Sequence, residues 1–273
     1  MKKITLIRAR NRSQLIYLKE LWDYRELFVI FAWRDLKVRY KQTLIGAGWA
    51  IFQPLFSMFI FTFFFGNLAK IPSGGLPYSL FVLIGLVFWT YFSGILSNAS
   101  NSLIENENIV KKIYFPRVIL PLSKIITCFV DFVIAFVMLI LVALYFNKIP
   151  NYQALIYIPL GIIIASLAAS GSGLFLSAFN VKFRDVRYAL PFFIQMLIFL
   201  TPVIYPLNIV RPSFKYLLAL NPMTGVIESV RTVFEGGVIG WDTLGISLAS
   251  SIVIFIIGLN YFRATENYFA DIV

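Results

Sequence analysis

Long apolar runs separated by short charged connectors fill most of this chain. Each run approaches or exceeds the roughly 20 residues that cross a membrane as a helix. The runs occupy residues 46–68, 78–101, 117–146, 153–179, 188–205 and 244–262. Because backbone groups within lipid must hydrogen bond among themselves, the runs predict helices rather than strands. The sequence therefore predicts an all-α integral membrane protein with six transmembrane helices.

Residues 22–42 have the pattern of an amphipathic helix that lies in the membrane interface. One stripe of this helix is apolar and the face across from it is basic. The apolar stripe comprises Val29, Trp33, Leu36 and Tyr40, and the basic face comprises Arg34, Lys37 and Lys41. The pattern fits a passive anchor and a functional lever equally well.

Two connectors predict further short helices. In residues 105–115 acidic side chains come first and basic ones follow, an order that suits a helix dipole. That helix is a docking element for another protein or, as the pattern alone favours, part of a solvated loop. Residues 206–236 hold apolar pieces that are too short to cross and are interrupted by prolines. They predict re-entrant helices at the outer face, which would gate an exit or only pack.

Basic residues concentrate in alternate connectors. Residues 1–45, 102–124, 180–187 and 263–273 hold 19 of the 24 Lys and Arg residues. The positive-inside rule therefore predicts that both termini are cytosolic. The predicted organisation is a cytosolic N-terminal segment at 1–45, a transmembrane domain at 46–262 and a cytosolic tail at 263–273.

Composition supports this assignment. The chain is 59% hydrophobic and 14% charged, against about 25% charged in soluble domains. The first 45 residues carry 11 Lys and Arg and show no cleavable signal. The net charge of +11 suits anionic lipid headgroups, and no motif points to nucleic acid.

Aromatic residues make up 17% of the chain and form two stripes with helical spacing. The stripes comprise Trp49, Phe52, Phe56, Phe59 and Phe63 in the first run, and Tyr188, Phe192, Gln195 and Phe199 in the fifth. Aromatic faces stack on sugar rings, so these stripes would line a glycan pathway. For any single Phe, contact with lipid is the more ordinary interpretation. A ridge of small residues in the fourth run, from Gly161 to Ser177, predicts close helix packing.

Few reactive groups lie inside the runs. Asp131 is the only carboxylate at mid-membrane depth, which makes it a functional candidate. A polar contact with another helix or subunit is favoured over a proton relay, because no second acid, His or Lys lies at that depth. Cys128 is single, and the chain has no His. The sequence holds no metal-ligand cluster, no nucleophile–His pair and no GxxxxGK[ST] loop, so uphill transport would need an ion gradient or a separate ATPase.

Several short strings follow one another in a distinctive order. They are Arg34–Tyr40 with Leu44–Gly46, Trp49 and Pro54, then Asn108–Lys112 with Phe115–Arg117 and Leu120–Pro121, then Phe183–Val186, Thr201–Pro206, and Asn221–Met223 with Arg231. From about residue 25 to the C-terminus, the chain resembles the permease subunits of type-2 ATP-binding-cassette exporters of polysaccharides. This family serves O-antigen, capsule and teichoic-acid export.

The resemblance implies a homodimer in the cytoplasmic (inner) membrane with a channel along its axis. Two copies of a cytosolic P-loop ATPase would bind ATP and Mg, so this chain would be a transport subunit without cofactor or metal, not an enzyme. The cargo would be a polysaccharide on a polyprenyl-diphosphate lipid. Residues 22–42 would form the cytosolic gate helix and 206–236 the outer gate helices.

The resemblance also implies roles for individual residues. The coupling helix at 105–115 would dock into the ATPase through Glu105, Glu107, Ile109, Lys111, Lys112, Tyr114 and Phe115. Near the entrance, Arg34, Arg39 and Lys41 would attract the lipid diphosphate or only bind phospholipid. Three other functions remain open: an exporter of lipids or drugs, an ion-coupled secondary transporter that uses Asp131, and a membrane scaffold.

Overall fold

The computed structural model describes residues 20–41, 46, 48–183, 185–238, 240–266 and 269. The predicted N-terminal segment before residue 20, most of the tail, and residues 44, 45 and 184 of the matching strings lie outside the described residues. The described part is helical and contains no strand. Its helices are α2 (Arg25–Lys41), α3 (Gly48–Phe61) with the π-helix η1 (Thr62–Leu68), α4 (Tyr78–Glu105), α5 (Glu107–Lys112), α6 (Ile119–Tyr145), α7 (Ala154–Lys182), α8 (Val186–Leu200), the 3-10 helix η2 (Leu207–Ile209), α9 (Pro212–Ala219), α10 (Pro222–Glu235) and α11 (Trp241–Thr265). The predicted all-α class is confirmed.

Five helices of the described part are long and apolar enough to cross a membrane: α3 with η1, α4, α6, α7 and α11. The predicted fifth span is α8, which has 15 residues and covers about 22 Å of a hydrocarbon core of about 30 Å. It ends because Thr201 takes an extended backbone before Pro202, and a residue that precedes proline disfavours helix. Length and composition thus support five complete spans and one shorter apolar helix.

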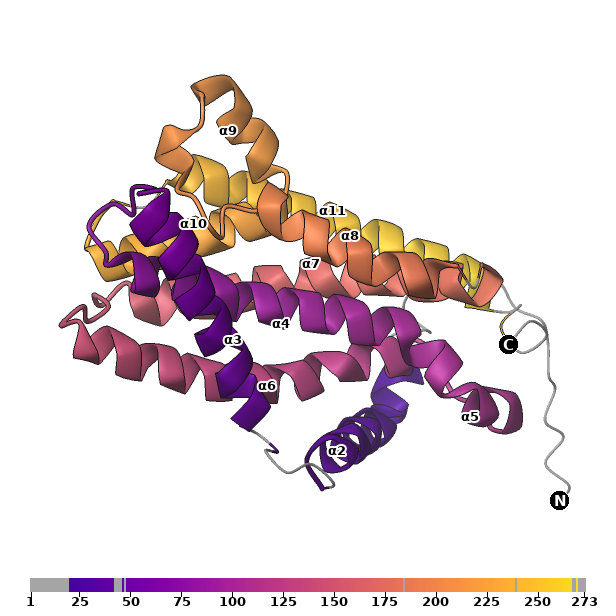
Figure 1. The fold of residues 1–273 in the computed structure, drawn as a ribbon. Helices are drawn as coiled ribbons and strands as arrows, with labels where there is room; N and C mark the ends of the chain where they lie inside the picture. Colours follow the sequence, from indigo (N-terminus) through magenta and orange to yellow (C-terminus); the bar gives the residue numbers. More distant parts are fainter. Residues whose placement is uncertain are drawn as a thin grey trace, which may run out of the picture.

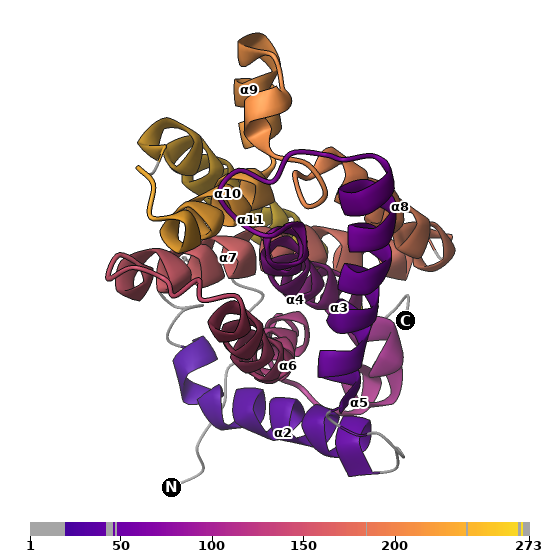
Figure 2. The same cartoon turned by 60° about the vertical axis from the view of Figure 1, so that its left-hand side comes forward.

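The centre of the bundle is α4, around which α3, α6, α7 and α10 pack (Figures 1 and 2). Every residue from Leu80 to Trp89 is buried. A helix that is apolar on all sides reaches this degree of burial only inside a bundle. The large side chains of α4 therefore form most of the core together with residues of α6, α7 and α10.

The small-residue ridge of α7 brings neighbouring helices close. Ala165 is fully buried, and a Cβ atom on Gly173 would lie 2.6 Å from the Cβ atom of Ala99 on α4. On another side of α7, a Cβ atom on Gly258 of α11 would overlap the carbonyl oxygen of Gly171. Only small residues allow backbones to approach this closely. The packing role predicted for the ridge is confirmed.

Helix α2 crosses the long helices at one end of the bundle (Figures 1 and 2). It buries Phe31 and Ala32 against the protein, whereas Val29 and Trp33 of the predicted apolar stripe are 61% and 68% exposed. Val29 and Trp33 thus face away from the bundle, whereas Leu36 is partly buried and Tyr40 contacts Asp131 of α6. The exposed part of the stripe suits a helix that contacts a membrane surface.

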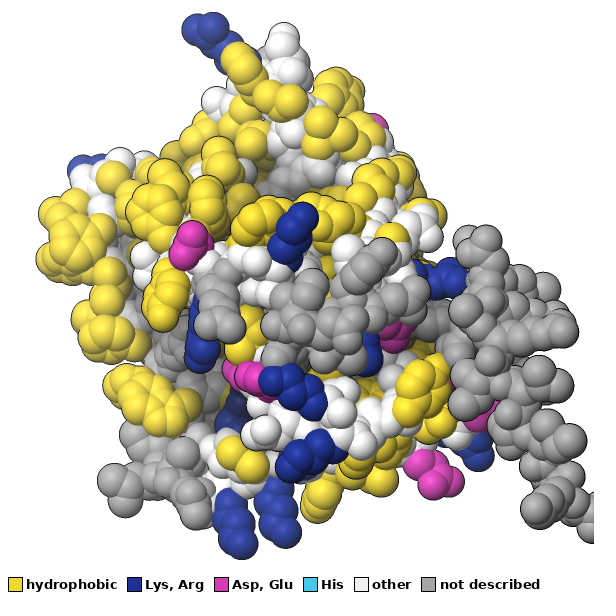
Figure 3. Space-filling model, turned by 90° about the vertical axis from the view of Figure 1, so that its right-hand side faces the viewer, with side chains coloured by type: hydrophobic (Ala, Val, Ile, Leu, Met, Phe, Trp, Pro, Cys, Tyr) yellow, Lys and Arg dark blue, Asp and Glu magenta, His cyan; other side chains and the backbone are white. Residues whose placement is uncertain are grey.

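The two ends of the bundle differ. At one end, called the α5 end, a second apolar cluster joins α2, α5 and α11 through Phe31, Val110, Phe115 and Phe262. Lys and Arg side chains are spread over this end (Figure 3). At the opposite end α10 is buried in the bundle and the short helix α9 projects from it (Figure 1).

Candidate functional site

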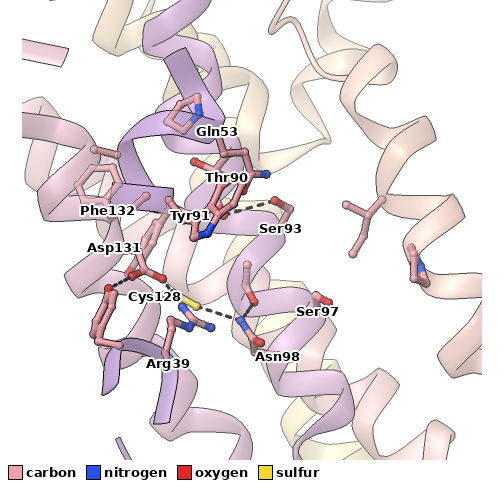
Figure 4. A pocket seen from close by; sticks show the side chains of 18 of the residues that line it. Arg39, Gln53, Thr90, Tyr91, Ser93, Ser97, Asn98, Cys128, Asp131 and Phe132 are labelled. Carbon is pink, nitrogen blue, oxygen red and sulfur yellow. Dashed lines mark hydrogen bonds and ion pairs between the residues drawn. The ribbon is translucent and has the colours of Figure 1, made fainter. Parts of the chain in front are cut away.

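A pocket of about 570 Å³ opens between α3, α4, α6 and α8, next to the C-terminal end of α2 (Figure 4). Its volume falls in the range of roughly 300–1,000 Å³ that is common for small-ligand sites. Aromatic rings of Trp49, Tyr91 and Phe132 contribute to its wall. The polar lining residues are Arg39, Tyr40, Gln53, Thr90, Ser93, Ser97, Asn98, Asp131 and Gln195.

One face of α4 provides a polar strip along this pocket, made of Thr90, Ser93, Ser97 and Asn98. These four residues are partly exposed, whereas the residues between them are largely buried. Thr90 and Ser93 donate hydrogen bonds from their hydroxyl groups to carbonyl oxygens one turn back, at 3.0 and 3.4 Å. The Asn98 amide donates to the carbonyl oxygen of Gly94 at 2.7 Å. Thr90, Ser93 and Asn98 thus donate within the protein, and their side-chain oxygens keep the capacity to accept hydrogen bonds.

Asp131 on α6 anchors the end of α2 at the pocket. Its carboxylate accepts hydrogen bonds from the Arg39 guanidinium and from the Tyr40 hydroxyl (Figure 4). This is the contact with another helix that the sequence predicts for Asp131. Burial lowers the pKa of Arg39, but the adjacent Asp131 carboxylate outweighs it and the pKa is raised overall. Burial and the bond to Asp131 raise the pKa of Tyr40, so both donors keep their protons at neutral pH.

A second ion pair joins the same two helices, this time with the positive charge on α6 and the negative charge on α2. The Lys124 ammonium on α6 lies 2.6 Å from the Asp35 carboxylate on α2, and Lys124 is only 7% exposed. Arg34 binds the other oxygen of Asp35 at 2.8 Å. Burial raises the pKa of Asp35, but hydrogen bonds from Lys124 and Arg34 outweigh it, so the pKa lies below its ordinary value. Two ion pairs therefore hold α2 against α6.

The predicted coupling segment divides into an exposed and a buried part. The exposed residues are Glu105, Lys111, Lys112 and Tyr114, while Glu107 and Ile109 are partly buried. Phe115 is 3% exposed and packs against Phe31 of α2, with ring centroids 5.6 Å apart. The segment 105–115 therefore presents a polar surface outward and contacts α2 through Phe115.

The predicted aromatic stripe of α3 lies on the outside of this single chain. Its members, Trp49, Phe52, Phe56, Phe59 and Phe63, are between 49% and 69% exposed. The ring of Phe52 stacks on that of Phe56 with centroids 5.8 Å apart. On α8, Tyr188, Phe192, Gln195 and Phe199 are exposed as well.

The structure brings together only some of the predicted site residues. The pocket is lined by Trp49 and Gln195, which the sequence assigns to the pathway, and by Arg39, which it assigns to the entrance. Arg34 is partly exposed and paired with Asp35, and Lys41 is exposed.

At the opposite end, Arg231 of α10 fixes the irregular segment that follows α8. Its guanidinium is buried and donates to the carbonyl oxygens of Phe81, Pro202 and Val203 at 3.1, 2.6 and 2.6 Å. The Asn221 amide donates to the Thr201 hydroxyl at 2.7 Å. The strings Thr201–Pro206 and Asn221–Met223 thus meet in space. Non-helical backbone is tolerated within a membrane where protein covers it in this way.

The polar strip of α4 was not among the sites predicted from the sequence. Its signal was present, because Thr90, Ser93, Ser97 and Asn98 recur at helical spacing inside an otherwise apolar run. Polar residues at such positions face a bundle interior or a water-filled cavity. The pairing of Asp35 with Lys124 had no such signal, because the two residues are 89 positions apart.

These features define a class: a multi-pass helical membrane protein with a polar pocket among its spans and a small polar helix at one end. Residues 26–234 match the ABC-2 type transporter family, and the chain belongs to this family. It is 27% identical over 247 residues to the O-antigen export system permease protein RfbA of Klebsiella pneumoniae, covering 90% of this chain and 95% of that protein. An RfbA of Myxococcus xanthus is 25% identical, covering 93% and 97%. The polysialic acid transport protein KpsM of Escherichia coli is 24% identical, covering 85% and 91%.

Proposed function

We propose that this chain is the membrane-spanning subunit of an exporter that moves lipid-linked polysaccharide, of the O-antigen, capsule or teichoic-acid type, across the cytoplasmic membrane. The observation that carries this proposal is the similarity over nearly the whole chain to proteins named as O-antigen export permeases. A relative named for polysialic acid transport supports the wider class of polysaccharide cargo.

Energy would come from two copies of a separate cytosolic P-loop ATPase, which would bind ATP and Mg. The exposed polar surface around α5 supports a docking role for residues 105–115. Tyr114 is exposed next to Lys111 and Lys112, and tyrosine is enriched at the core of protein interfaces, whose rim is polar. In this arrangement α5 faces the cytosol, and so do both termini if α8 and residues 201–206 complete a sixth crossing.

The pathway would run between two copies of this chain, along the aromatic faces of α3 and α8. Only 6% of the apolar window of Gly48–Leu68 is buried within one chain, against 78% of that of α4. A second copy would cover part of this exposed face. Aromatic rings along the remainder would let sugar rings slide past without tight binding.

The basic residues of α2 would attract the lipid diphosphate at the entrance. Lys41 is exposed and has the clearest access. Arg34 and Arg39 lie against Asp35 and Asp131, which offsets part of their charge.

Deletion of the gene in its own host tests the cargo. We expect lipid-linked glycan to accumulate inside the cells and complementation to clear it. A lipid or drug exporter would leave that glycan unchanged, and this outcome would contradict the proposal. An ion-coupled transporter would instead lose activity when an uncoupler is added with ATP intact.

The aromatic faces need a separate test. Replacement of Phe52, Phe56, Phe59 and Phe63 by Leu keeps the surface apolar and removes the rings. We expect export to fall while assembly with the ATPase persists. The matched control replaces Val133, Val137 and Leu141, which are exposed on α6, by Ala. Equal loss in both variants would show that the stripe of α3 has only a lipid-facing role.

A further inference from the structure

We propose that the pocket between α3, α4, α6 and α8 binds uncharged sugar rings of the passing polymer and does not hold its diphosphate. This inference deepens the proposed function and depends on it. It assigns the polar strip Thr90, Ser93, Ser97 and Asn98 as the surface that contacts sugar hydroxyl groups.

The charge balance of the pocket supports a neutral ligand. Arg39 and Asp131 are the charged residues of its described lining, and they are paired with each other. A diphosphate in this pocket would find no uncompensated cation and would be repelled by the Asp131 carboxylate. A neutral ligand would meet neither obstacle.

The hydrogen-bonding groups of the pocket match hydroxyl groups. Thr90, Ser93 and Asn98 line the pocket and donate to backbone oxygens of α4, so their side-chain oxygens keep the capacity to accept. Gln53 and Gln195, on the facing helices α3 and α8, carry amides that both donate and accept. A sugar hydroxyl also donates and accepts, so it can satisfy both kinds of group at once.

Helix packing alone does not explain why these polar residues lie where they do. The neighbouring surface of α4 is buried against other helices, but these polar residues stay partly exposed and border a cavity. Polar side chains among membrane spans are costly unless they have partners. Trp49, which is 52% exposed, adds an aromatic face at the pocket on which the apolar side of a sugar ring can stack.

The test measures protection of a thiol in the pocket. The chain has one cysteine, Cys128, so Cys128→Ser gives a thiol-free background. Ser97→Cys in this background places a thiol in the lining, and Tyr152→Cys places a control thiol at an exposed position between α6 and α7, outside the pocket. Both proteins are assembled with the ATPase in nanodiscs and labelled with a small hydrophilic methanethiosulfonate. The probes are a panel of uncharged di- and trisaccharides and inorganic pyrophosphate.

We expect at least one saccharide, at about four times its Kd, to slow labelling of Ser97→Cys about fivefold, because the labelling rate follows the fraction of unoccupied sites. Pyrophosphate should leave that rate unchanged, and the Tyr152→Cys rate should not respond to either probe. Protection by pyrophosphate alone would make the pocket a diphosphate site and overturn the inference. Absence of labelling, absence of protection by any saccharide, or equal protection at both positions would also overturn it.

A second variant tests the same surface in transport. Asn98→Leu keeps the side-chain size and removes the amide, and Asn260→Leu makes the same change at an exposed position on α11 outside the pocket. We expect Asn98→Leu to slow export about fivefold with assembly and ATP hydrolysis retained. Unchanged export would contradict the subsite. If cells without the protein accumulate lipid-linked glycan but saccharides give no protection, the subsite fails and the proposed function stands.

Discussion

Phe31 of α2 packs against Phe115, which follows α5, with ring centroids 5.6 Å apart and an interplanar angle of 42°. This contact links the surface proposed to dock the ATPase with the helix whose other end reaches Asp131 at the pocket. Because two ion pairs also attach α2 to α6, displacement of α5 would pull on the pocket wall through α2. The structure thus contains a continuous physical connection between the proposed motor contact and the proposed pathway.

Phe115→Leu tests this connection. The change keeps an apolar side chain and removes the ring contact, which is worth about 0.5–1.5 kcal/mol for an aromatic pair. We expect the complex to assemble and hydrolyse ATP while export falls several-fold, measured together in proteoliposomes. The control is Tyr114→Leu, an exposed neighbour that should instead weaken ATPase binding. Loss of ATPase binding by Phe115→Leu would show that Phe115 acts in docking.

Asp35→Leu should strongly destabilise the protein. It leaves the buried Lys124 ammonium without its closest partner, a change that typically costs about 3–5 kcal/mol. The double variant Asp35→Leu/Lys124→Met should recover most of the loss, as read from thermal unfolding in detergent. Glu107→Gln, which breaks an exposed pair with Lys111, should have little effect. A double variant as unstable as the single one would contradict the pairing.

The ion pair of Asp35 also predicts a pH dependence. Because the pKa of Asp35 is lowered in the folded protein, its contribution to stability is present above the unfolded pKa of about 3.9 and is lost as pH falls through the folded value. We therefore expect the thermal midpoint of the wild type to fall more steeply than that of Asp35→Asn below about pH 4. Parallel curves for the two proteins would exclude this contribution.

Arg231→Lys should destabilise the segment that follows α8. An ammonium cannot reach three carbonyl oxygens with the planar geometry of the guanidinium. Each buried carbonyl left without a donor costs about 1–3 kcal/mol. Limited proteolysis should show new cleavage near residues 201–206. The same substitution at the exposed Arg211 should leave the digestion pattern unchanged.

The apolar runs predicted most of the helices because membrane length and backbone hydrogen bonding leave few alternatives. Spans two, three, four and six begin and end within a few residues of their predicted limits, and the ridge on α7 packs as expected. The predicted fifth span was longer than α8, because an apolar run does not reveal where Thr201 leaves the helix. Individual site roles remain predictions, since the sequence carries no information on which aromatic faces meet a partner or a cargo.

The sequence by itself determined that this chain is a helical membrane protein, where its basic connectors lie and to which family its ordered strings point. These properties follow from hydropathy, charge and local residue order, which are local along the chain. The tertiary structure alone decided that Asp35 meets Lys124, that Arg39 meets Asp131, and that the polar strip of α4 borders a cavity. Such contacts depend on how helices rotate and cross when they pack, and that is set by the whole bundle at once.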